Sequence, residues 1–202
     1  MQINGKHYRT IWLKEGAEPT VQVIDQRRLP HALVIEDLNT PEDFVRAIRE
    51  MHVRGAPLIG ATAAYAVYNA LYHAPLDKRR LGKYVRDTVD VLLNTRPTAV
   101  NLSYALERMM KAIEPAEEIS EMVQVALQTA EAITEESIEH CKAIGEHGLD
   151  IIQKISKKKK GEPVNILTHC NAGWLACIDH GTATAPIYAA HDAGIPVHVW
   201  VD

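Results

Sequence analysis

A change of pattern at residue 161 constrains the fold more than any other feature of this 202-residue sequence. After Gly161, a short apolar run from Val164 to His169 has the length and composition of a buried strand. A polar turn follows, then a helix is predicted from about Thr184 to Asp192 and a second strand from Ile195 to Val201. A strand, a helix and a strand within roughly forty residues form a βαβ unit, which implies a parallel strand pair with a right-handed crossover.

This unit is expected to be only the beginning of an open parallel sheet. Two parallel strands alone do not form a stable sheet, and the sequence stops on the second strand, at Asp202. The open edge would need cover from further chain, from a partner or from a separate polypeptide. We therefore predict an α/β protein in which residues 161–202 begin a Rossmann-like, open parallel C-terminal domain.

Residues 1–160 are predicted to form a mainly helical N-terminal domain with a small β-sheet at its start. The stretches Tyr8 to Leu13 and Thr20 to Ile24 have strand character. Thr40 and Thr98 are predicted N-caps of two helices. Apolar periodicity predicts helices over residues 41–54, 57–72, 77–93, 99–113 and 117–155.

The longest predicted helix contains Gly145 and Gly148, which mark either a break or a close contact with another helix. It leads into a basic run, Lys157 to Lys160. Cations suit the C-terminal end of a helix dipole. We therefore interpret the run as a last helical turn that continues into a solvated loop, rather than as a contact for nucleic acid or lipid.

Composition predicts a soluble, cytoplasmic protein. Hydrophobic residues make up 47% and charged residues 24% of the chain, and the net charge of -4 provides no positive field for nucleic acid or an anionic membrane. Met1 to Arg9 lack the apolar region of a secretory signal, and no stretch approaches the ~18 apolar residues of a membrane span. Three widely spaced cysteines without an export signal suit free thiols in a reducing compartment.

Two arginines precede predicted helices in a setting suited to anions. Arg54 is followed by Gly55, Ala56 and a proline, and Arg96 also stands directly before a proline. Glycine lets a ligand approach the backbone, free N–H groups point out of a helix start, and a guanidinium offers a fork of donors to phosphate. If the two sites converge, they form a two-sided anion clamp. Taken singly, each motif also fits a tight connection between helices with a solvent-facing arginine.

Cys170 follows the first strand of the βαβ unit, at the edge where open parallel sheets bind ligands. A thiol there suits acid–base or nucleophilic chemistry, but it could equally pack into the core. Cys141 and Cys177 are interpreted as inert core thiols, and the spacing of the cysteines predicts no zinc site. The stretch Gly181 to Pro186 could bind an anion at a helix start, but we favour a close-packed turn, because no basic residue accompanies it.

Together these motifs resemble methylthioribose-1-phosphate isomerase of the methionine salvage pathway, over essentially the whole chain and in the family's order. The wider superfamily includes ribose-1,5-bisphosphate isomerase and the alpha, beta and delta regulatory subunits of the eukaryotic translation initiation factor two-B. The segments that carry the resemblance are Ile24-Asp25-Gln26, Leu29-Pro30, Arg54 to Gly60, Thr95 to Leu102, Ile166 to Gly173, Gly181 to Pro186 and Val197 to Asp202.

The resemblance implies an aldose–ketose isomerase that converts 5-methylthioribose 1-phosphate to 5-methylthioribulose 1-phosphate. By resemblance, Arg54, Gly55, Ala56 and Arg96 bind the substrate, chiefly its phosphate, and Cys170 is the active-site cysteine. The family pattern calls for no metal and no organic cofactor. It implies a small sugar phosphate as the partner, without nucleic acid or membrane, and a homodimer formed through the C-terminal domain.

In the family, a catalytic aspartate and further substrate contacts lie beyond the position of Asp202, which matches the start of an Asp-Glu-Thr-Arg-Pro run. We therefore expect this chain alone to be inactive. Two alternatives share much of the pattern. A non-catalytic regulatory subunit of the initiation-factor type would not need a reactive thiol beside phosphate-binding arginines. An isomerase of a ribose bisphosphate would need a basic pocket for its second phosphate.

Overall fold

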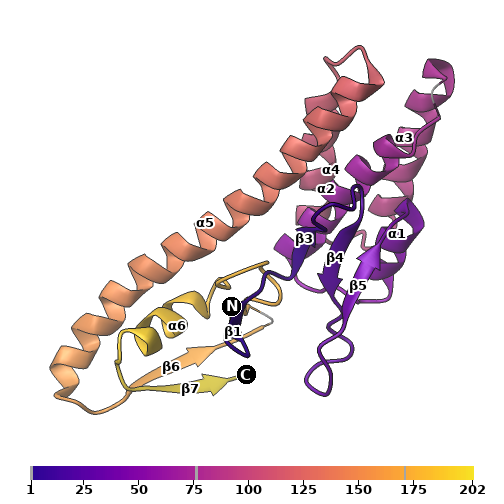
Figure 1. Ribbon diagram of the computed structural model, residues 1–202. Helices are drawn as coiled ribbons and strands as arrows, with labels where there is room; N and C mark the ends of the chain where they lie inside the picture. The colour runs from indigo at the N-terminus through magenta and orange to yellow at the C-terminus, as the bar shows by residue number, and fades with distance from the viewer. Residues whose placement is uncertain (1, 76, 171) are drawn as a thin grey trace. The chain divides into compact units, whose positions relative to one another are not determined.

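The computed structural model describes residues 2–75, 77–170 and 172–202 (Figure 1), so Asn171 of the cysteine motif lies outside the described residues. The chain folds into two compact units. The helical unit is Ile11–Glu135, and the parallel-sheet unit combines Met1–Thr10 with Glu136–Asp202. The domain division of the sequence, 1–160 and 161–202, stays a prediction.

The helical unit begins with a three-stranded antiparallel sheet in the order β3 (Ile11–Leu13), β4 (Val21–Ile24) and β5 (Ile35–Leu38). The first two strands confirm the predicted small sheet. The third was not predicted, because its two central residues are acidic and its apolar pattern is only four residues long. One of these acids, Asp37, accepts hydrogen bonds from Lys14 Nζ at 2.6 Å and from Gln22 Nε2 at 2.7 Å, so polar pairing stabilises this side of the sheet.

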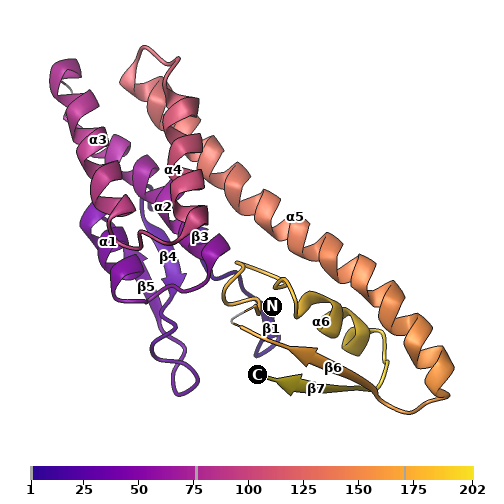
Figure 2. The ribbon, with the colours of Figure 1, turned by 180° about the vertical axis from the view of Figure 1, so that it is seen from behind.

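Four helices of the helical unit follow the sheet: α1 (Pro41–Arg49), α2 (Ala56–Tyr72), α3 (Lys78–Leu93) and α4 (Val100–Ile113). Helix α2 is buried along almost its whole length and packs against α1, α3 and α4 (Figures 1 and 2). It can occupy this central place because most of its residues are alanine or other apolar residues, which need no polar partner.

Helix α1 begins as predicted and ends earlier than predicted. Thr40 and Asp43 form a capping box, in which the Asp43 carboxylate accepts the Thr40 backbone N–H at 3.0 Å. The helix ends at Arg49 rather than near residue 54, because Met51 adopts a left-handed conformation with φ 59°. The backbone N–H of His52 then bonds back to the carbonyl of Ala47 at 2.9 Å. This type of helix end is normally recognised in a sequence by a glycine, which is lacking here.

The parallel-sheet unit confirms the βαβ prediction. Strand β6 (Val164–Thr168) leads through a loop to helix α6 (Ala185–Asp192) and then to β7 (Val197–Val201), which pairs parallel to β6. The unit also contains a short antiparallel hairpin of β1 (Gln2–Ile3) and β2 (Lys6–His7), which the polar sequence there did not predict. The fold is therefore a mixed α/β architecture.

Helix α5 (Ile119–Lys159) contributes residues to both units, and its C-terminal half packs on α6 (Figure 2). A Cβ added at Gly148 would collide with the ring of Pro186, and one at Gly145 would lie 3.3 Å from the carbonyl oxygen of Ala185. The two glycines therefore mark a close helix contact and not a break. Although α5 has 41 residues, no helix in the described part of the chain is long and apolar enough to cross a membrane.

Candidate functional site

The start of α2 has an open backbone that only glycine readily adopts. Gly55 is the N-cap residue, with φ 98° and ψ 138°, a combination that strains any side chain. No side chain caps the helix and no acidic residue lies in its first turn. Arg54 and Ala56 are both exposed. The exposed guanidinium, the bare glycine and the uncapped N–H groups together suit an anionic ligand.

Arg96 lies in the connection between α3 and α4 and is half-buried. The backbone N–H of Ala99 bonds to the carbonyl of Arg96 at 2.9 Å, which folds the connection into a turn. Ala99, rather than the predicted Thr98, is the N-cap of α4, and the N-cap offers no side-chain hydrogen bond. The first turn of α4 also lacks acidic residues. The start of α4 is thus uncapped in the same way as the start of α2.

The two uncapped helix starts lie together. Gly60, in the second turn of α2, packs against Asn101, in the first turn of α4, so closely that an added Cβ would lie 2.9 Å from the Asn101 carbonyl oxygen. Arg54 and Arg96 therefore precede neighbouring ends of one helix pair. Within the described residues, neither guanidinium has an ion-pair partner. The structure thus places the helix starts that follow Arg54 and Arg96 next to each other, and the positive ends of the two helix dipoles add at this end of the pair.

Cys170 belongs to the other unit and lies at the carboxyl end of β6. The register pairs Thr168 with Val201, and the side chains of His169 and Asp202 approach to 3.2 Å at the same edge of the sheet. Cys170 is exposed and has φ 72°, a left-handed conformation that is rare for a residue with a side chain. Its thiol is therefore not packed in the core. The grouping of Cys170 with the two arginines in one site stays a prediction.

The loop after Cys170 is held by its own packing. Ala172 accepts hydrogen bonds from the backbone of Thr182 at 2.9 Å and from the hydroxyl of Thr184 at 3.0 Å. A Cβ at Gly181 would lie 2.8 Å from the Ala172 carbonyl oxygen. Close packing therefore requires this glycine, which agrees with the close-packed turn predicted for Gly181 to Pro186.

The remaining cysteines, Cys141 and Cys177, are buried and pack with Ala176 in one small core cluster. A hydrogen bond with Cys177 and burial both raise the pKa of the Cys141 thiol. The burial predicted for both cysteines is confirmed. A thiol with a raised pKa is protonated at neutral pH, so Cys141 is a poor nucleophile, whereas the hydrogen bond with Cys141 lowers the pKa of Cys177 to about 7.

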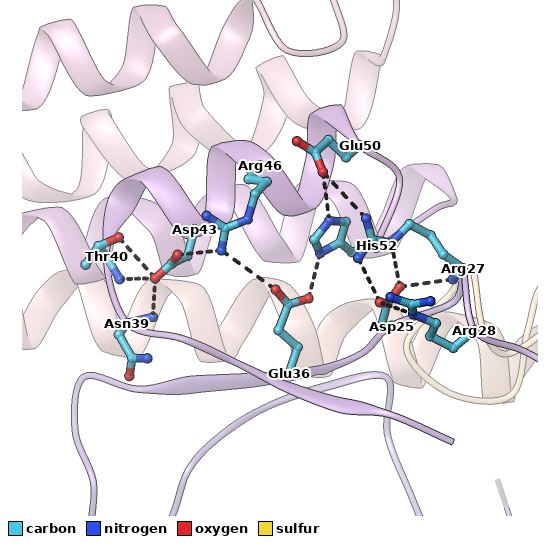
Figure 3. A network of polar contacts seen from close by, with 10 residues as sticks. All are labelled: Asp25, Arg27, Arg28, Glu36, Asn39, Thr40, Asp43, Arg46, Glu50 and His52. Carbon is cyan, nitrogen blue, oxygen red and sulfur yellow. Dashed lines mark hydrogen bonds and ion pairs between the residues drawn. The ribbon is translucent and has the colours of Figure 1, made fainter. Parts of the chain in front are cut away.

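A polar network beside Arg54 was not identified from the sequence. Asp25, Glu36 and His52 place side-chain oxygen and nitrogen atoms within 4.8 Å of one another, in an arrangement that could also hold a metal ion (Figure 3). Asp25 lies after β4, Glu36 in β5 and His52 two residues before Arg54. These positions are far apart in the sequence, so only the position of His52 next to the arginine motif could have drawn attention to the network.

The chain is similar to known isomerases and to an initiation-factor subunit. It is 52% identical to methylthioribose-1-phosphate isomerase of Desulfatibacillum aliphaticivorans, covering 100% of this chain and 54% of the relative, and 48% identical to that of Escherichia coli O45:K1, covering 100% and 53%. The chain therefore spans about half the length of the curated relatives it matches.

Two crystal structures have the same fold. That of 5-methylthioribose 1-phosphate isomerase from Pyrococcus horikoshii OT3 matches with a TM-score of 0.84 and 32% identity, over 98% of this chain and 53% of the other. That of translation initiation factor eIF-2B, subunit delta, from A. fulgidus matches with a TM-score of 0.80 and 32% identity, over 96% and 54%. The profile of the initiation factor 2 subunit family matches residues 52–202, and the chain therefore belongs to this family.

Proposed function

We propose that this chain is part of an aldose–ketose isomerase that converts 5-methylthioribose 1-phosphate to 5-methylthioribulose 1-phosphate in methionine salvage. The observation that carries the proposal is the pair of uncapped helix starts, each preceded by an arginine without an ion-pair partner in the described residues. Curated relatives about half identical to the chain have this activity in their names. Because the chain matches only about half of each relative, the activity belongs to the protein that contains it.

The position of the phosphate in the substrate determines which chemical steps the site must support. It sits on the anomeric oxygen, so the sugar ring must open before a hydrogen can move from C2 to C1. C2 is oxidised to a ketone as C1 is reduced, so the electrons balance within one molecule and no external oxidant or reductant is needed. In the proposal, Arg54, Gly55, Ala56 and Arg96 bind the phosphate, and Cys170 assists the hydrogen transfer or stabilises its transition state.

The test is ketose formation from 5-methylthioribose 1-phosphate, followed by NMR in the protein that contains this chain. Arg96→Ala should raise KM and lower kcat/KM by about 10- to 150-fold, because a hydrogen bond to a charged group contributes ~1.5–3 kcal/mol. Cys170→Ala should lower kcat while substrate binding stays close to that of the wild type. Arg80→Ala, on the exposed surface of α3, is the matched control. Wild-type protein that forms no ketose would refute the proposal.

A regulatory subunit is the second candidate, because the subunit delta structure matches the chain nearly as well as the isomerase structure does. Such a protein would bind translation-factor subunits and would show no affinity for a sugar phosphate. Affinity capture combined with a sugar-phosphate titration separates the two functions. If a ribose bisphosphate is the better substrate in the same assay, the protein is instead an isomerase of ribose bisphosphates.

We also propose that the protein is cytoplasmic and forms a homodimer through its parallel-sheet unit. The support is the exposed apolar surface of the two strands, where Leu167 is 73%, Trp200 58% and Val201 79% accessible. Such surface is normally covered by further chain or by a second copy. Analytical ultracentrifugation of the protein that contains this chain measures its mass in solution, and a monomeric mass at all concentrations would argue against the dimer.

A further inference from the structure

His52 is a buried histidine enclosed by charged side chains (Figure 3). Its side chain is 3% exposed. The charged groups around it come from the end of β4 and the turn after it, from β5, and from α1 and its C-cap. They are Asp25, Arg27, Arg28, Glu36, Arg46 and Glu50.

Both ring nitrogens of His52 face carboxylate oxygens. Nδ1 lies 2.6 Å from Glu36 Oε2, and Nε2 lies 3.4 Å from Glu50 Oε2. An ionised carboxylate only accepts hydrogen bonds, and a neutral imidazole carries hydrogen on one nitrogen alone. The ring therefore satisfies both contacts only as an imidazolium. A neutral ring would leave one carboxylate facing a lone pair.

The surrounding charges agree with a positive ring. Hydrogen bonds from Arg27 hold the pKa of the Asp25 carboxyl below its usual value against the opposing effect of burial, and the charge of His52 adds to this lowering. Glu36 is also 3.8 Å from Arg46, and Glu50 is 3.5 Å from Arg27. The network thus alternates cations and anions from one side to the other.

A metal ion is the competing occupant of this cluster. Asp25, Glu36 and His52 have the spacing of three metal ligands. However, Arg27 binds Asp25 through Nε and Nη2, each at 2.9 Å, and Arg46 lies beside Glu36. A divalent cation would be repelled by these guanidinium groups and would take carboxylate oxygens that are already bonded. The cluster therefore fits a proton on His52 better than a metal.

His52 connects the turn between α1 and α2 to the neighbouring elements. Its backbone N–H bonds to Ala47 in α1 at 2.9 Å, and its carbonyl accepts the N–H of Gln26, after β4, at 2.9 Å. Its ring reaches β5 through Glu36 and the end of α1 through Glu50. The turn is thus joined to three elements at one residue, and Arg54 follows two residues later.

We propose that His52 is a positioning residue, a buried imidazolium that fixes the turn between α1 and α2 and thereby sets the backbone from which Arg54 and Gly55 reach an anion. The effect on phosphate binding rests on the proposed function, whereas the fixing of the turn does not. Loss of the ring proton removes one of the two side-chain contacts, so the turn loosens as pH rises.

The test is amide hydrogen exchange of residues 50–53, whose backbone N–H groups are hydrogen-bonded, in the full chain at pH 6 and pH 8.5, corrected for intrinsic exchange rates. In wild-type protein, protection of these amides should fall at least tenfold at the higher pH. In His52→Gln, protection should be low at both values. Glu50→Gln keeps the buried ring and alters only one partly exposed acceptor, so it should reduce the pH effect even if His52→Gln folds poorly. His191→Gln, at an 80% exposed histidine, is the control.

Several outcomes decide the matter. Protection that is equal at both pH values, or NMR shifts of a neutral His52 ring at pH 6, would overturn the proposal. Added equimolar Zn²⁺ that protects the turn would assign the cluster to a metal and also overturn it. If the pH effect is present but the wild-type chain binds no inorganic phosphate, the fixing of the turn by His52 stands and the proposed function loses its anion site. If phosphate binds equally well to wild type and to a folded His52→Gln variant, the positioning role falls and the proposed function stands.

Discussion

The Asp43 carboxylate caps α1, whereas no side chain caps α2 or α4. The first four N–H groups of any helix lack partners within that helix, and a side chain, water or a ligand satisfies them. At α1 the protein supplies the partner itself. At α2 and α4 it leaves the groups open and places Arg54 and Arg96 just before them. A bound phosphate would complete both starts.

Gly55 is the residue on which the open start of α2 depends most. With φ 98° and ψ 138°, Gly55→Ala should destabilise the fold by about 1–3 kcal/mol and weaken phosphate binding, because the alanine will shift the backbone. Gly161→Ala is a matched control, because Gly161 has the same φ of 98° and lies outside the proposed site. Urea unfolding and phosphate titration measure the two effects. Equal phosphate affinity in the two variants would contradict the assignment of Gly55.

Met51 carries backbone strain at the end of α1. A residue at φ 59° is more stable as glycine, so Met51→Gly should stabilise the chain by about 0.5–1 kcal/mol. The side chain is 49% exposed, so little packing is lost. Met51→Ala keeps the strain and should change stability by less than ~0.5 kcal/mol. A Met51→Gly variant no more stable than Met51→Ala in urea would show that this turn is not strained.

At the scale of elements, the contact between α2 and α4 fixes the distance between the two arginine sites. Gly60→Ala would force its Cβ against the Asn101 carbonyl, which should destabilise the chain by about 1–3 kcal/mol and separate the helix starts. Gly82→Ala in α3 would meet only the flexible side chain of Arg86, at 3.4 Å, and should instead stabilise by up to ~1 kcal/mol through helix propensity. Opposite signs in urea unfolding would confirm this difference, whereas two stabilised variants would contradict the close contact.

The elements with strong local signals could be predicted from the sequence. The βαβ unit, the central alanine-rich helix and the capping box at Thr40 each depend on residues close together in the chain. The end of α1 could not be predicted, because Met51 adopts a conformation that sequence normally assigns to glycine. Strand β5 forms because β4 offers it a partner, which no pattern within its own four residues reveals.

The candidate site could also be predicted only in part from local sequence patterns. Arg54 and Arg96 could be selected from their motifs, but their neighbouring positions depend on Gly60 packing on Asn101, a contact between distant parts of the sequence. The His52 network was missed for the same reason, since its members come from three segments.

For the whole molecule, acid should destabilise the fold through its paired carboxylates. Hydrogen bonds from Lys14 and Gln22 lower the pKa of Asp37, and those from Arg27 lower that of Asp25. The unfolded chain therefore binds protons first, near pH 4. The stabilisation is present above this pH and is lost as pH falls through the lower folded pKa values.

Urea unfolding between pH 7 and pH 3 measures this acid dependence. Asp37→Asn should be less stable than wild type at pH 7 and should lose less stability on acidification. Asp192→Asn, at an 82% exposed aspartate, is the control and should follow the wild type. An Asp37→Asn variant with the wild-type pH dependence would show that this pair does not contribute.

Binding of 5-methylthioribose 1-phosphate and of its dephosphorylated form, measured by calorimetry on this chain, tests the anion site most directly. The phosphorylated sugar should bind and the free sugar should not. Arg54→Ala and Arg96→Ala should each weaken binding by about 10- to 150-fold, while Arg80→Ala should have no effect. Equal affinity for the two sugars, or unchanged affinity in both site variants, would contradict the role assigned to the paired helix starts.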